Sequence, residues 1–330
     1  MSDLALAAFA AETGSHLVHE PRRRGFERFR RSFDEVAYRS GLEANGMRFV
    51  GRSESAYPSL LRELHDPPPG LFLRGAASLE LLERQAVAIV GARVCSSYGS
   101  HVSRGLGRDL AGAGLVVISG LARGVDGEAH RGALESGGST VAVLGCGIDR
   151  DYPAGHAQLA ARICERSLIV SEYARGVEPA PWRFPARNRI IAGLAAATIV
   201  VEARERSGAL ITADFALEAG REVFAVPGEI TSTLSAGTNA LLRLGATPLT
   251  GVGDVLEALG VAAPTPLQLE LGGTAAGVLA AVAEEAAGID QLVRATGLDA
   301  AAVATALAEL ELAGAVAEMD GLYRGVRPPG

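Results

Sequence analysis

The stretch AVAIVGAR, residues 86–93, decides the fold of this 330-residue chain. Five apolar residues in succession are typical of a strand that is buried on both faces of a parallel sheet. Gly91 then permits a tight turn, and Arg93 stands before a helical pattern. Five further apolar runs alternate with helical patterns in the same way. The six predicted strands are Ala86–Val90, Leu115–Ser119, Thr140–Leu144, Leu168–Ser171, Ala197–Val201 and Glu222–Val226.

This alternation extends over residues 46–260 and predicts an α/β domain with a doubly wound, mainly parallel sheet. Residues 1–45 are expected to form a small helical N-terminal segment, SAM-like or similar, with an arginine-rich patch from Arg22 to Arg31. Residues 261–273 contain two prolines and a final glycine pair, which predicts a linker. A ligand of the α/β domain should bind beyond the carboxyl ends of its strands.

Residues 274–330 are predicted to form a winged-helix-like domain. Asp290 is expected to cap a short helix, and Asp299 a longer helix that ends near Ala313. Two short strands follow, joined by an Asp-Gly turn at residues 320–321. The segment holds three arginines against eight acidic residues, and its longer helix contains no arginine. A reader of the DNA major groove needs positive charge there, so we expect a structural or protein-contact role.

The basic residues restrict the chemistry of the whole chain. None of the 31 is a lysine, which excludes a Walker A loop and any Schiff-base mechanism. Phosphate recognition would have to use arginine, backbone amides and helix N-termini. The net charge of −7 argues against non-specific binding of polyanions by the whole surface. A nucleic-acid site would therefore be a local cluster.

The remaining composition points to a globular protein of a reducing compartment. Apolar residues make up 48% and charged residues 21% of the chain, and no uncharged apolar run reaches the roughly 18 residues of a membrane span. The apolar residues at the N-terminus lack a preceding basic segment, so no secretory signal is expected. The three cysteines are far apart and form neither a metal spacing nor a disulfide framework. We expect a cytoplasmic protein without a metal or other cofactor.

Candidate binding residues follow two of the predicted strands. Gly91 and Arg93 come after the first, while Ser119 ends the second and Gly120 and Arg123 follow it. Glycine loops of this kind let backbone N–H groups approach a phosphate, and an arginine can add a bidentate contact. The dinucleotide pattern GxGxxG is absent at the loop after the first strand and also at Gly145-Cys146-Gly147, so neither place carries a standard dinucleotide fingerprint.

Asp126 and His130 lie four residues apart on the helix that follows these loops. They are either an acid–base pair or a capped helix start with a hydrogen-bonded buried histidine, and we favour the second interpretation. The sequence offers neither an obvious nucleophile nor a metal cluster to accompany a catalytic pair.

The densest cluster of candidate binding residues is RFPARNR, residues 183–189. Arginines can hold phosphates, an aromatic ring can stack on a base, and an asparagine amide can read a base edge, which together suit unpaired nucleotides. A glycine turn with hydroxyl groups then begins a predicted helix and offers a second anion site. The alternative is an arginine-rich loop that pairs with neighbouring glutamates. The candidate residues are Arg183, Phe184, Arg187, Asn188, Arg189, Ser207 and Gly208.

Ordered motifs across residues 48–260 carry a resemblance to a known family. They are VAIVGAR (87–93), SGLARGVD (119–126), VAVLGCGID (141–149), FPARNRIIAG (184–193), SGALITA (207–213), REVFAVPG (221–228) and GTN (237–239). Shorter matches are Tyr57-Pro58, DPP (66–68), Tyr152-Pro153 and VEA (201–203). The chain resembles the DNA-processing protein A (DprA, also called Smf) family, and the winged-helix outline also fits it.

The resemblance implies an extended Rossmann-like core that forms homodimers and has no enzymatic activity. It further implies that the protein binds and protects single-stranded DNA entering during natural transformation and helps to load the recombinase RecA. Where relatives use lysine for phosphate, this chain has arginine or no basic residue. The motif positions that face the family's DNA pocket are Arg93, Gly120, Arg123, Phe184, Arg187, Asn188, Arg189, Ser207 and Gly208.

Two other functions and one further contact stay open at this point. The core could belong to a nucleotide-hydrolysing enzyme built around Asp126 and His130, or the winged helix could read duplex DNA as a regulator. The segment NALLRLG, residues 239–245, offers an apolar stripe for self-association, although ordinary core packing would give the same pattern. The candidate dimer residues are Asn239, Leu241, Leu242 and Leu244.

Overall fold

The computed structural model describes residues 2–13, 25–262, 272–284, 287–313, 315–319 and 321–325. The chain forms two compact units, Met1–Val261 and Ala262–Gly330. Parts of three predictions lie outside the described residues. These parts are Arg22–Arg24 of the arginine-rich patch, residues 263–271 of the linker, and Asp320 of the hairpin turn.

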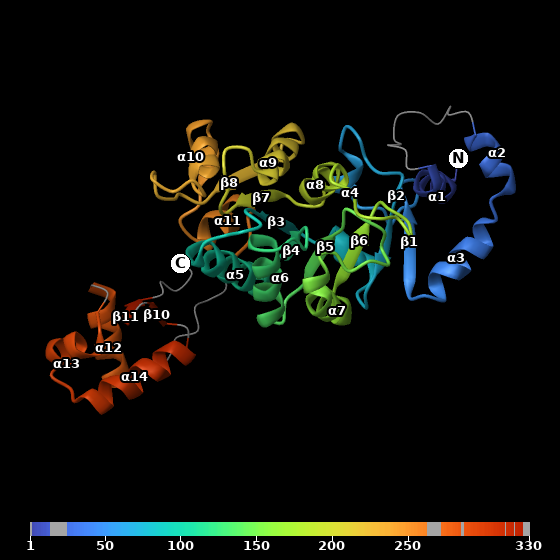
Figure 1. Ribbon diagram of the computed structural model, residues 1–330. Helices are drawn as coiled ribbons and strands as arrows, with labels where there is room; N and C mark the ends of the chain where they lie inside the picture. Colours follow the sequence, from blue (N-terminus) through green and yellow to red (C-terminus); the bar gives the residue numbers. More distant parts are fainter. Residues whose placement is uncertain are drawn as a thin grey trace. The chain divides into compact units, whose positions relative to one another are not determined.

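The larger unit is built on a nine-stranded sheet (Figure 1). Its strands are β1 (Met47–Gly51), β2 (Gly70–Arg74), β3 (Ala86–Val90), β4 (Val116–Ser119), β5 (Thr140–Val143), β6 (Leu168–Ser171), β7 (Ala197–Val200), β8 (Glu222–Ala225) and β9 (Thr247–Pro248). The order is β1-β2-β6-β5-β4-β3-β7-β8-β9, in which β6 through β9 run parallel while β2 pairs antiparallel with β6 and with β1. The predicted fold class is confirmed, and each of the six predicted strands agrees with the structure to within one residue at either end.

Helices cover both faces of this sheet (Figure 1). Helices α8, α9 and α10 lie on one face, and α5, α6 and α7 lie on the other. The bounds in this part of the chain are α4 (Ser59–Arg62), α5 (Ser97–Gly112), α6 (Val125–Glu135), α7 (Ala157–Arg166), α8 (Arg183–Gly193), α9 (Gly208–Glu218), α10 (Ala236–Arg243) and α11 (Val252–Ala258), with short 3₁₀ helices η1 (Leu79–Glu83) and η2 (Ala154–His156).

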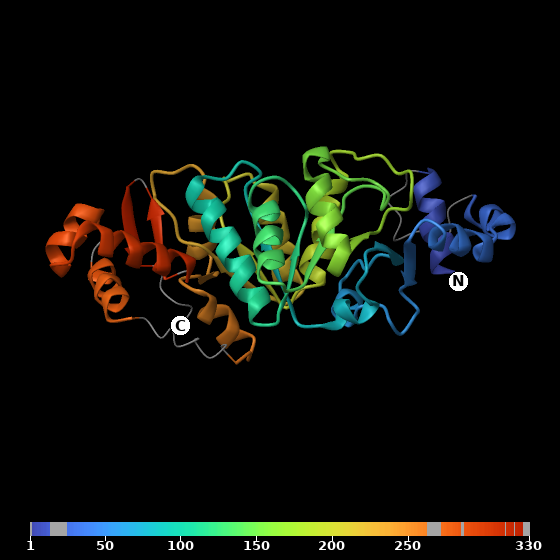
Figure 2. The same cartoon turned by 90° about the horizontal axis from the view of Figure 1, so that it is seen from below.

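Helices α5 and α6 run side by side (Figure 2). Glycines make this close approach of the two backbones possible. A Cβ atom on Gly107 would lie 2.2 Å from the carbonyl oxygen of Ala129, and one on Gly132 would lie 2.0 Å from that of Arg104. Any side chain at either position would therefore separate the two helices.

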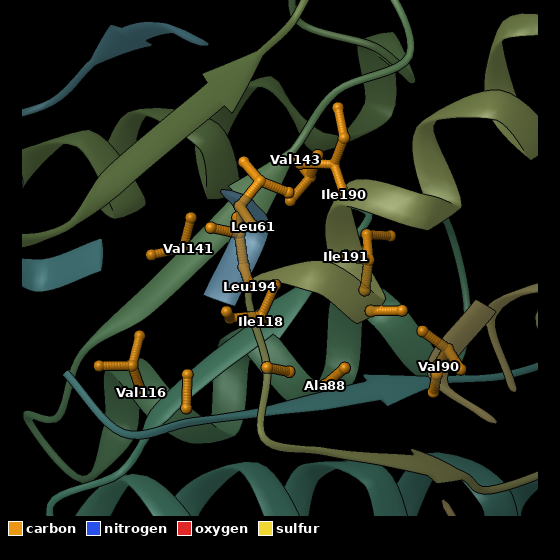
Figure 3. Close-up of a cluster of buried hydrophobic side chains, with 14 of the residues drawn as sticks. Leu61, Ala88, Val90, Val116, Ile118, Val141, Val143, Ile190, Ile191 and Leu194 are labelled. Atoms are coloured by element: carbon orange, nitrogen blue, oxygen red, sulfur yellow. The ribbon is translucent and has the colours of Figure 1, made fainter. Parts of the chain in front are cut away.

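Helix α8, which carries most of the candidate binding residues, is anchored to the sheet by apolar packing (Figure 3). Ile190, Ile191 and Leu194 are almost fully buried and belong to one cluster with valine side chains of β3, β4 and β5. Burial of each such side chain stabilises the fold by about 1.5–3 kcal/mol. The first turn of α8 is therefore held at the carboxyl edge of the sheet.

The N-terminal segment is helical in its described residues, as predicted. It contains α1 (Asp3–Thr13), α2 (Phe26–Ser32) and α3 (Glu35–Glu43). The Phe9 and Phe26 rings meet edge to face at 5.4 Å, and Asp34 caps α3 by accepting the Ala37 N–H at 2.9 Å. Asp3 accepts the Ser53 N–H at 2.7 Å and so joins this segment to the turn after β1.

The smaller unit contains three helices and a hairpin, which is a winged-helix arrangement. Its elements are α12 (Gly273–Glu284), α13 (Ile289–Thr296), α14 (Ala300–Leu312), β10 (Val316–Met319) and the antiparallel β11 (Leu322–Gly325), around their own apolar core. Asp299 caps α14 as predicted, with the Ala302 N–H at 2.7 Å. The predicted cap at Asp290 is wrong, because α13 is capped two residues earlier, at Gly288, where the Gln291 side chain accepts the Gly288 N–H at 2.8 Å.

Two properties of the described residues bear on the expectations from composition. None of the helices there combines the length and the apolar character needed to cross a membrane. The three cysteines, Cys95, Cys146 and Cys164, are free thiols.

Candidate nucleic-acid interface

The candidate site lies at the carboxyl edge of the sheet, where the strand order changes direction. From β3 the chain continues to β4 on one side, and it later returns to β7 on the other side. Ligands of doubly wound sheets bind at such a switch point. The loops after β3 and β4, together with the first turns of α8 and α9, meet there around two adjoining pockets.

The switch point itself is closed by Glu202, the second residue after β7. Its backbone oxygen accepts the Ala92 N–H at 2.7 Å, and its carboxylate accepts the Ser96 N–H at 2.9 Å. Ser96 in turn caps α5 through the Gly99 N–H at 3.0 Å. A helix N-terminus at this position would favour an anion, but here an internal carboxylate already occupies it. One open pocket lies against the first turns of α8 and α9, and the other reaches from α8 to Arg131 of α6 and His156 of η2.

The smaller pocket, called the α9 pocket below, has a volume of about 220 Å³. Ser207 caps α9 by accepting the Ala209 N–H at 3.3 Å, and the Asn188 amide donates to the Gly208 carbonyl at 2.9 Å. Asn188 therefore fixes the junction between α8 and α9. The lining residues are Val90, Gly91, Arg93, Ala122, Asp126, Phe184, Pro185, Arg187, Asn188, Ile191, Ser207, Gly208, Ala209 and Thr212.

The larger pocket, called the arginine pocket below, has a volume of about 420 Å³. Four arginines and a histidine line it, and the described lining residues include no Asp or Glu. The two pockets share Arg93, Ala122, Phe184 and Arg187. The lining residues are Arg93, Gly120, Ala122, Arg123, Arg131, Gly145, Tyr152, Pro153, Gly155, His156, Phe184 and Arg187.

Arg187 is the buried cation common to both pockets, with only 4% of its surface exposed. Its Nη1 donates to the carbonyl of Gly120 at 2.8 Å and to that of Val143, and its Nε donates to the Asn188 side chain at 3.3 Å. A Cβ on Gly120 would lie 2.6 Å from Arg187 Nη2, so glycine is needed there. Burial lowers the pKa of Arg187 to about 10, and the guanidinium is still cationic at neutral pH.

An aromatic ring separates the two pockets. The Arg93 guanidinium lies 5.3 Å from the centroid of the Phe184 ring, and Tyr152 stacks on the same ring at 5.2 Å with an interplanar angle of 26°. Arg93 and Arg123 are exposed, and within the described part of the chain neither pairs with a carboxylate. Exposed aromatic rings beside unpaired guanidinium groups suit the bases and phosphates of an unpaired strand.

Asp126 and His130 are not arranged as an acid–base pair. The Asp126 carboxylate accepts the N–H groups of Gly120 and Ala122 at 3.1 and 3.3 Å, and burial raises its pKa against the opposing charge of Arg187. His130 is fully buried, and its Nδ1 lies 2.7 Å from the Thr140 hydroxyl. Burial lowers the pKa of His130 to about 3, so it stays neutral at physiological pH. The described residues also contain no cluster of His, Cys, Asp and Glu that could hold a metal ion.

Three candidate residues, Ser119, Arg183 and Arg189, do not line the pockets, and the Arg183 guanidinium lies instead 4.7 Å from the centroid of the Trp182 ring. Ser119 is fully buried and donates to the Ile89 carbonyl at 2.6 Å, which links β4 to β3. Arg189 makes a bidentate pair with Glu172 at 3.0 and 2.7 Å. Burial opposes the charge of Arg189, but the Glu172 carboxylate outweighs this effect and raises the pKa of Arg189 above its ordinary value. The Ser119 and Arg189 side chains therefore stabilise the carboxyl edge of the sheet without lining the pockets.

Sequence reasoning gave no chemical role to two aromatic residues at this edge. Tyr152 was noted only as part of a motif, although its ring completes the stack on Phe184. Trp182 stands directly before the arginine-rich cluster and contacts Arg183. Their nearness to arginines could have suggested both, but only the fold brings Tyr152 to Phe184.

The candidate dimer residues divide between the core and the surface. Leu241 is buried, Leu242 packs against the core, and Asn239 exchanges hydrogen bonds with the backbone of Gly228. Leu244 alone among the four is strongly exposed, at 85%. A self-contact at this segment would therefore centre on Leu244.

Comparison with known protein families gives two matches. Residues 48–260 match the family described as DNA recombination-mediator protein A. Residues 261–321 match the family described as the DprA winged helix domain. The first match covers the whole sheet except part of β1, together with both pockets.

Individual relatives agree with these matches. The DNA processing protein DprA of Streptococcus pneumoniae is 45% identical over 207 residues, which cover 62% of this chain and 71% of that protein. The X-ray structure of DprA from Streptococcus pneumoniae has a TM-score of 0.66 at 36% identity, covering 78% of this chain and 92% of that one. A structure of Helicobacter pylori DNA processing protein A, described for its single-stranded DNA binding mode, has a TM-score of 0.58 at 31% identity, covering 64% and 95%.

Proposed function

Because this chain belongs to the DNA recombination-mediator protein A family, we propose that it binds single-stranded DNA at the carboxyl edge of its sheet, without breaking any bond. The single-stranded DNA binding mode described for the Helicobacter pylori relative supports this assignment. The edge is the place in the larger unit where cations, aromatic rings and two pockets coincide.

The observation that carries the proposal is the arginine pocket. Arg93, Arg123 and Arg187 converge there beside Phe184, with no carboxylate among the described lining residues, in a chain whose net charge is −7. Asp126 opposes the charge of Arg187, but Arg93 and Arg123 have no ion pair in the described part of the chain, and their positive charge would favour an anionic ligand. A polyanion with exposed bases satisfies both the guanidinium groups and the aromatic face.

Each residue has a proposed role in holding the strand. Arg187 and the N-terminus of α9, at Ser207 and Gly208, hold phosphate groups. Arg93 and Arg123 add charge-assisted contacts from the rim of the pockets. Phe184 supplies the stacking surface. Gly91 lets the backbone approach, since a Cβ there would lie 2.6 Å from Val125.

We expect binding with little sequence preference. The side chain best suited to read a base edge is Asn188, and its amide already bonds to Gly208 and Arg187. Contacts to phosphates and stacking on aromatic rings are possible with every base.

Catalysis has little support in the arrangement of the edge. A nucleotide-hydrolysing enzyme built around Asp126 and His130 would need both side chains to face a pocket, whereas His130 is buried against Thr140 and lines neither of them. Incubation of the protein with a panel of nucleotides tests this: we expect neither free base nor phosphate, and release that is abolished by His130→Ala would overturn the assignment.

We further propose that the cytoplasmic protein protects strands taken up during natural transformation and helps to load RecA onto them. The family description as a recombination mediator supports this step. RecA ATP hydrolysis on DNA coated with a single-strand binding protein would measure it. We expect faster activation in the presence of this protein, and an unchanged lag would contradict the proposed loading.

We also propose that the chain self-associates through the end of α10, because the Leu244 side chain is exposed there. An aliphatic side chain that is 85% exposed gains free energy when a second copy covers it. Light scattering of Leu244→Arg should show a monomer where the unchanged chain is a dimer. An unchanged dimer would remove this residue from the interface.

Crystals soaked with a short thymidine oligomer would locate the strand directly. We expect nucleotides across the α9 pocket and the arginine pocket, with phosphates near Arg93 and Arg187. A strand lying on the winged-helix unit while the edge stays empty would overturn the proposed site.

A further inference from the structure

A second aromatic and basic cluster lies beside the arginine pocket, in the segment that runs from the end of β6 to the first residue of α8. The Arg183 guanidinium is 4.7 Å from the centroid of the Trp182 ring and 5.2 Å from that of Tyr173. The Tyr173 and Trp182 rings meet edge to face, 6.4 Å apart at 82°. These three residues are called the tryptophan platform below.

The platform is partly exposed to solvent. Trp182 is 38% exposed, while Arg183 and Tyr173 are half-buried. Arg183 donates to the Glu178 carbonyl, which fixes the guanidinium between the two rings. Stacking on such a fixed surface costs little conformational entropy, so an incoming aromatic group would bind with most of its contact energy retained.

The platform continues the line of the proposed strand site. Gly145, which follows β5, contacts both regions, because a Cβ there would lie 2.9 Å from the Phe184 ring and 3.3 Å from the Arg183 carbonyl oxygen. Tyr173 follows β6, the next strand of the sheet. Trp182 and Arg183 directly precede Phe184, whose ring lines both pockets, so the platform adjoins the pocket wall and is within reach of a neighbouring nucleotide.

The charges around the platform favour an anion. Glu172 is paired with Arg189, Asp149 accepts the Gly176 N–H at 2.9 Å, and Glu178 is paired with Arg150 at 2.5 Å. Arg175 is exposed and has no ion pair in the described part of the chain. The nearby carboxylates are thus engaged, while a guanidinium stays available for phosphate.

We propose that the tryptophan platform is a further base-stacking site, on which a strand leaving the arginine pocket places its next nucleobase. This inference rests on the proposed function, since it extends the same strand path. The ligand is a nucleobase of any sequence, because every base offers an aromatic face.

Intrinsic fluorescence tests the proposal directly, since Trp182 is the single tryptophan of the chain. The full-length protein is titrated with oligo-dT while tryptophan emission is recorded, and the anisotropy of an end-labelled oligo-dT is followed in parallel. We expect the emission to be quenched in step with binding. Trp182→Ala should weaken binding about fivefold or more, while Trp182→Phe, which keeps an aromatic face, should bind nearly as the unchanged chain does.

The matched control is Tyr98→Ala. Tyr98 is an exposed aromatic residue of the same unit, but it lies near the Glu202 carboxylate at the closed N-terminus of α5. We expect its removal to leave the affinity unchanged. Circular dichroism confirms that each variant is folded, and the emission of the unchanged chain reports on the platform without any substitution.

Two results would overturn the proposal, and they are distinguishable. Binding seen by anisotropy, with unchanged tryptophan emission and an unchanged affinity of Trp182→Ala, would exclude the platform while the pockets remain the site. Absence of oligo-dT binding by the unchanged chain would overturn both this proposal and the proposed function.

Discussion

The larger unit and the winged-helix unit each carry charges that differ from those expected of proteins with the same fold outline. The winged helix has an outline that many duplex-binding proteins share, yet α14 carries Glu309 and Glu311 and no arginine. The larger unit has the outline of a nucleotide-binding enzyme, yet its edge holds the unpaired Arg93 and Arg123. The fold alone would favour the smaller unit as the DNA-binding part, whereas the positions of the exposed arginines favour the larger unit.

The same contrast exists within the larger unit. At the N-terminus of α5, Glu202 occupies the position that would attract a phosphate. At the N-terminus of α9, Ser207 and Gly208 line a pocket that Arg93 and Arg187 also face. An internal carboxylate already occupies the N-terminus of α5, whereas arginines add positive charge next to the N-terminus of α9.

The largest expected effect is that of Arg187→Ala, which removes the cation common to both pockets. We expect oligo-dT affinity to fall about 100-fold or more, because charge-assisted contacts are lost in each pocket. Stability should fall by about 3 kcal/mol, since Asp126 is left buried without its opposing charge. Anisotropy titration and urea unfolding measure the two effects.

Arg189→Ala is the matched control for that variant. It breaks the buried pair with Glu172 behind the edge, so we expect a comparable loss of stability while the folded protein keeps its affinity. Equal affinities of Arg187→Ala and the unchanged chain would remove Arg187 from the site.

Lowering the pH from 7 to 5 should reduce the stability of the larger unit through a buried histidine, an effect that the smaller unit cannot show because residues 262–330 contain no histidine. Burial lowers the pKa of His130 to about 3 in the folded state, so the neutral form stabilises the fold above the ordinary histidine pKa of about 6.5. This contribution is lost progressively as the pH falls below that value. Between pH 7 and pH 5 we expect the larger unit to lose about 2 kcal/mol by this effect.

Urea unfolding of the unchanged chain and of His130→Asn at both pH values isolates the histidine. The variant should be less stable at pH 7 but should lose less stability on acidification. The same pH dependence in both proteins would show that His130 is not the responsible group.

Arg93→Ala and Arg123→Ala test the rim of the pockets. Both side chains are exposed, so stability should change by no more than about 0.5 kcal/mol. Each variant should bind oligo-dT about tenfold more weakly and lower the salt slope by about one. Arg108→Ala, an exposed arginine near the other end of α5, is the matched control and should bind normally. A loss of affinity in the control equal to that at the rim would indicate a general charge effect instead.

The smallest effect is expected from removal of residues 272–330. The winged-helix unit has its own core and an acidic α14, so oligo-dT affinity should change less than about twofold. Anisotropy with the shortened chain measures this. Loss of binding would move the site to the smaller unit and reverse the comparison.

The core of the fold was predictable because buried parallel strands appear as continuous apolar runs. The antiparallel strands β1 and β2 were missed, since MRFVG and GLFLR mix apolar residues with arginine and glycine. The short β9 was missed as well. The observed cap of α13 at Gly288 differs from the expected cap at Asp290 by two residues, a margin typical of helix ends.

The candidate site was predictable only in outline. The Gly and Arg positions after β3 and β4 follow from the rule for parallel sheets. The partners of buried polar groups do not follow from sequence, because Glu202 closes a helix that begins 106 residues earlier at Ser96. For the same reason Arg189 was expected to face DNA, although Glu172 engages it.

One titration tests the central claim that unpaired strands bind at the arginine-lined edge. The anisotropy of labelled oligo-dT and of a blunt duplex is compared between about 50 and 200 mM salt. If Arg93, Arg123 and Arg187 contact about three phosphates, the slope of log affinity against log salt concentration should be about −2. Oligo-dT binding should therefore weaken about 20-fold over this range. The duplex should bind far more weakly at every salt concentration. Equal affinity for both forms, or binding that is indifferent to salt, would contradict the claim.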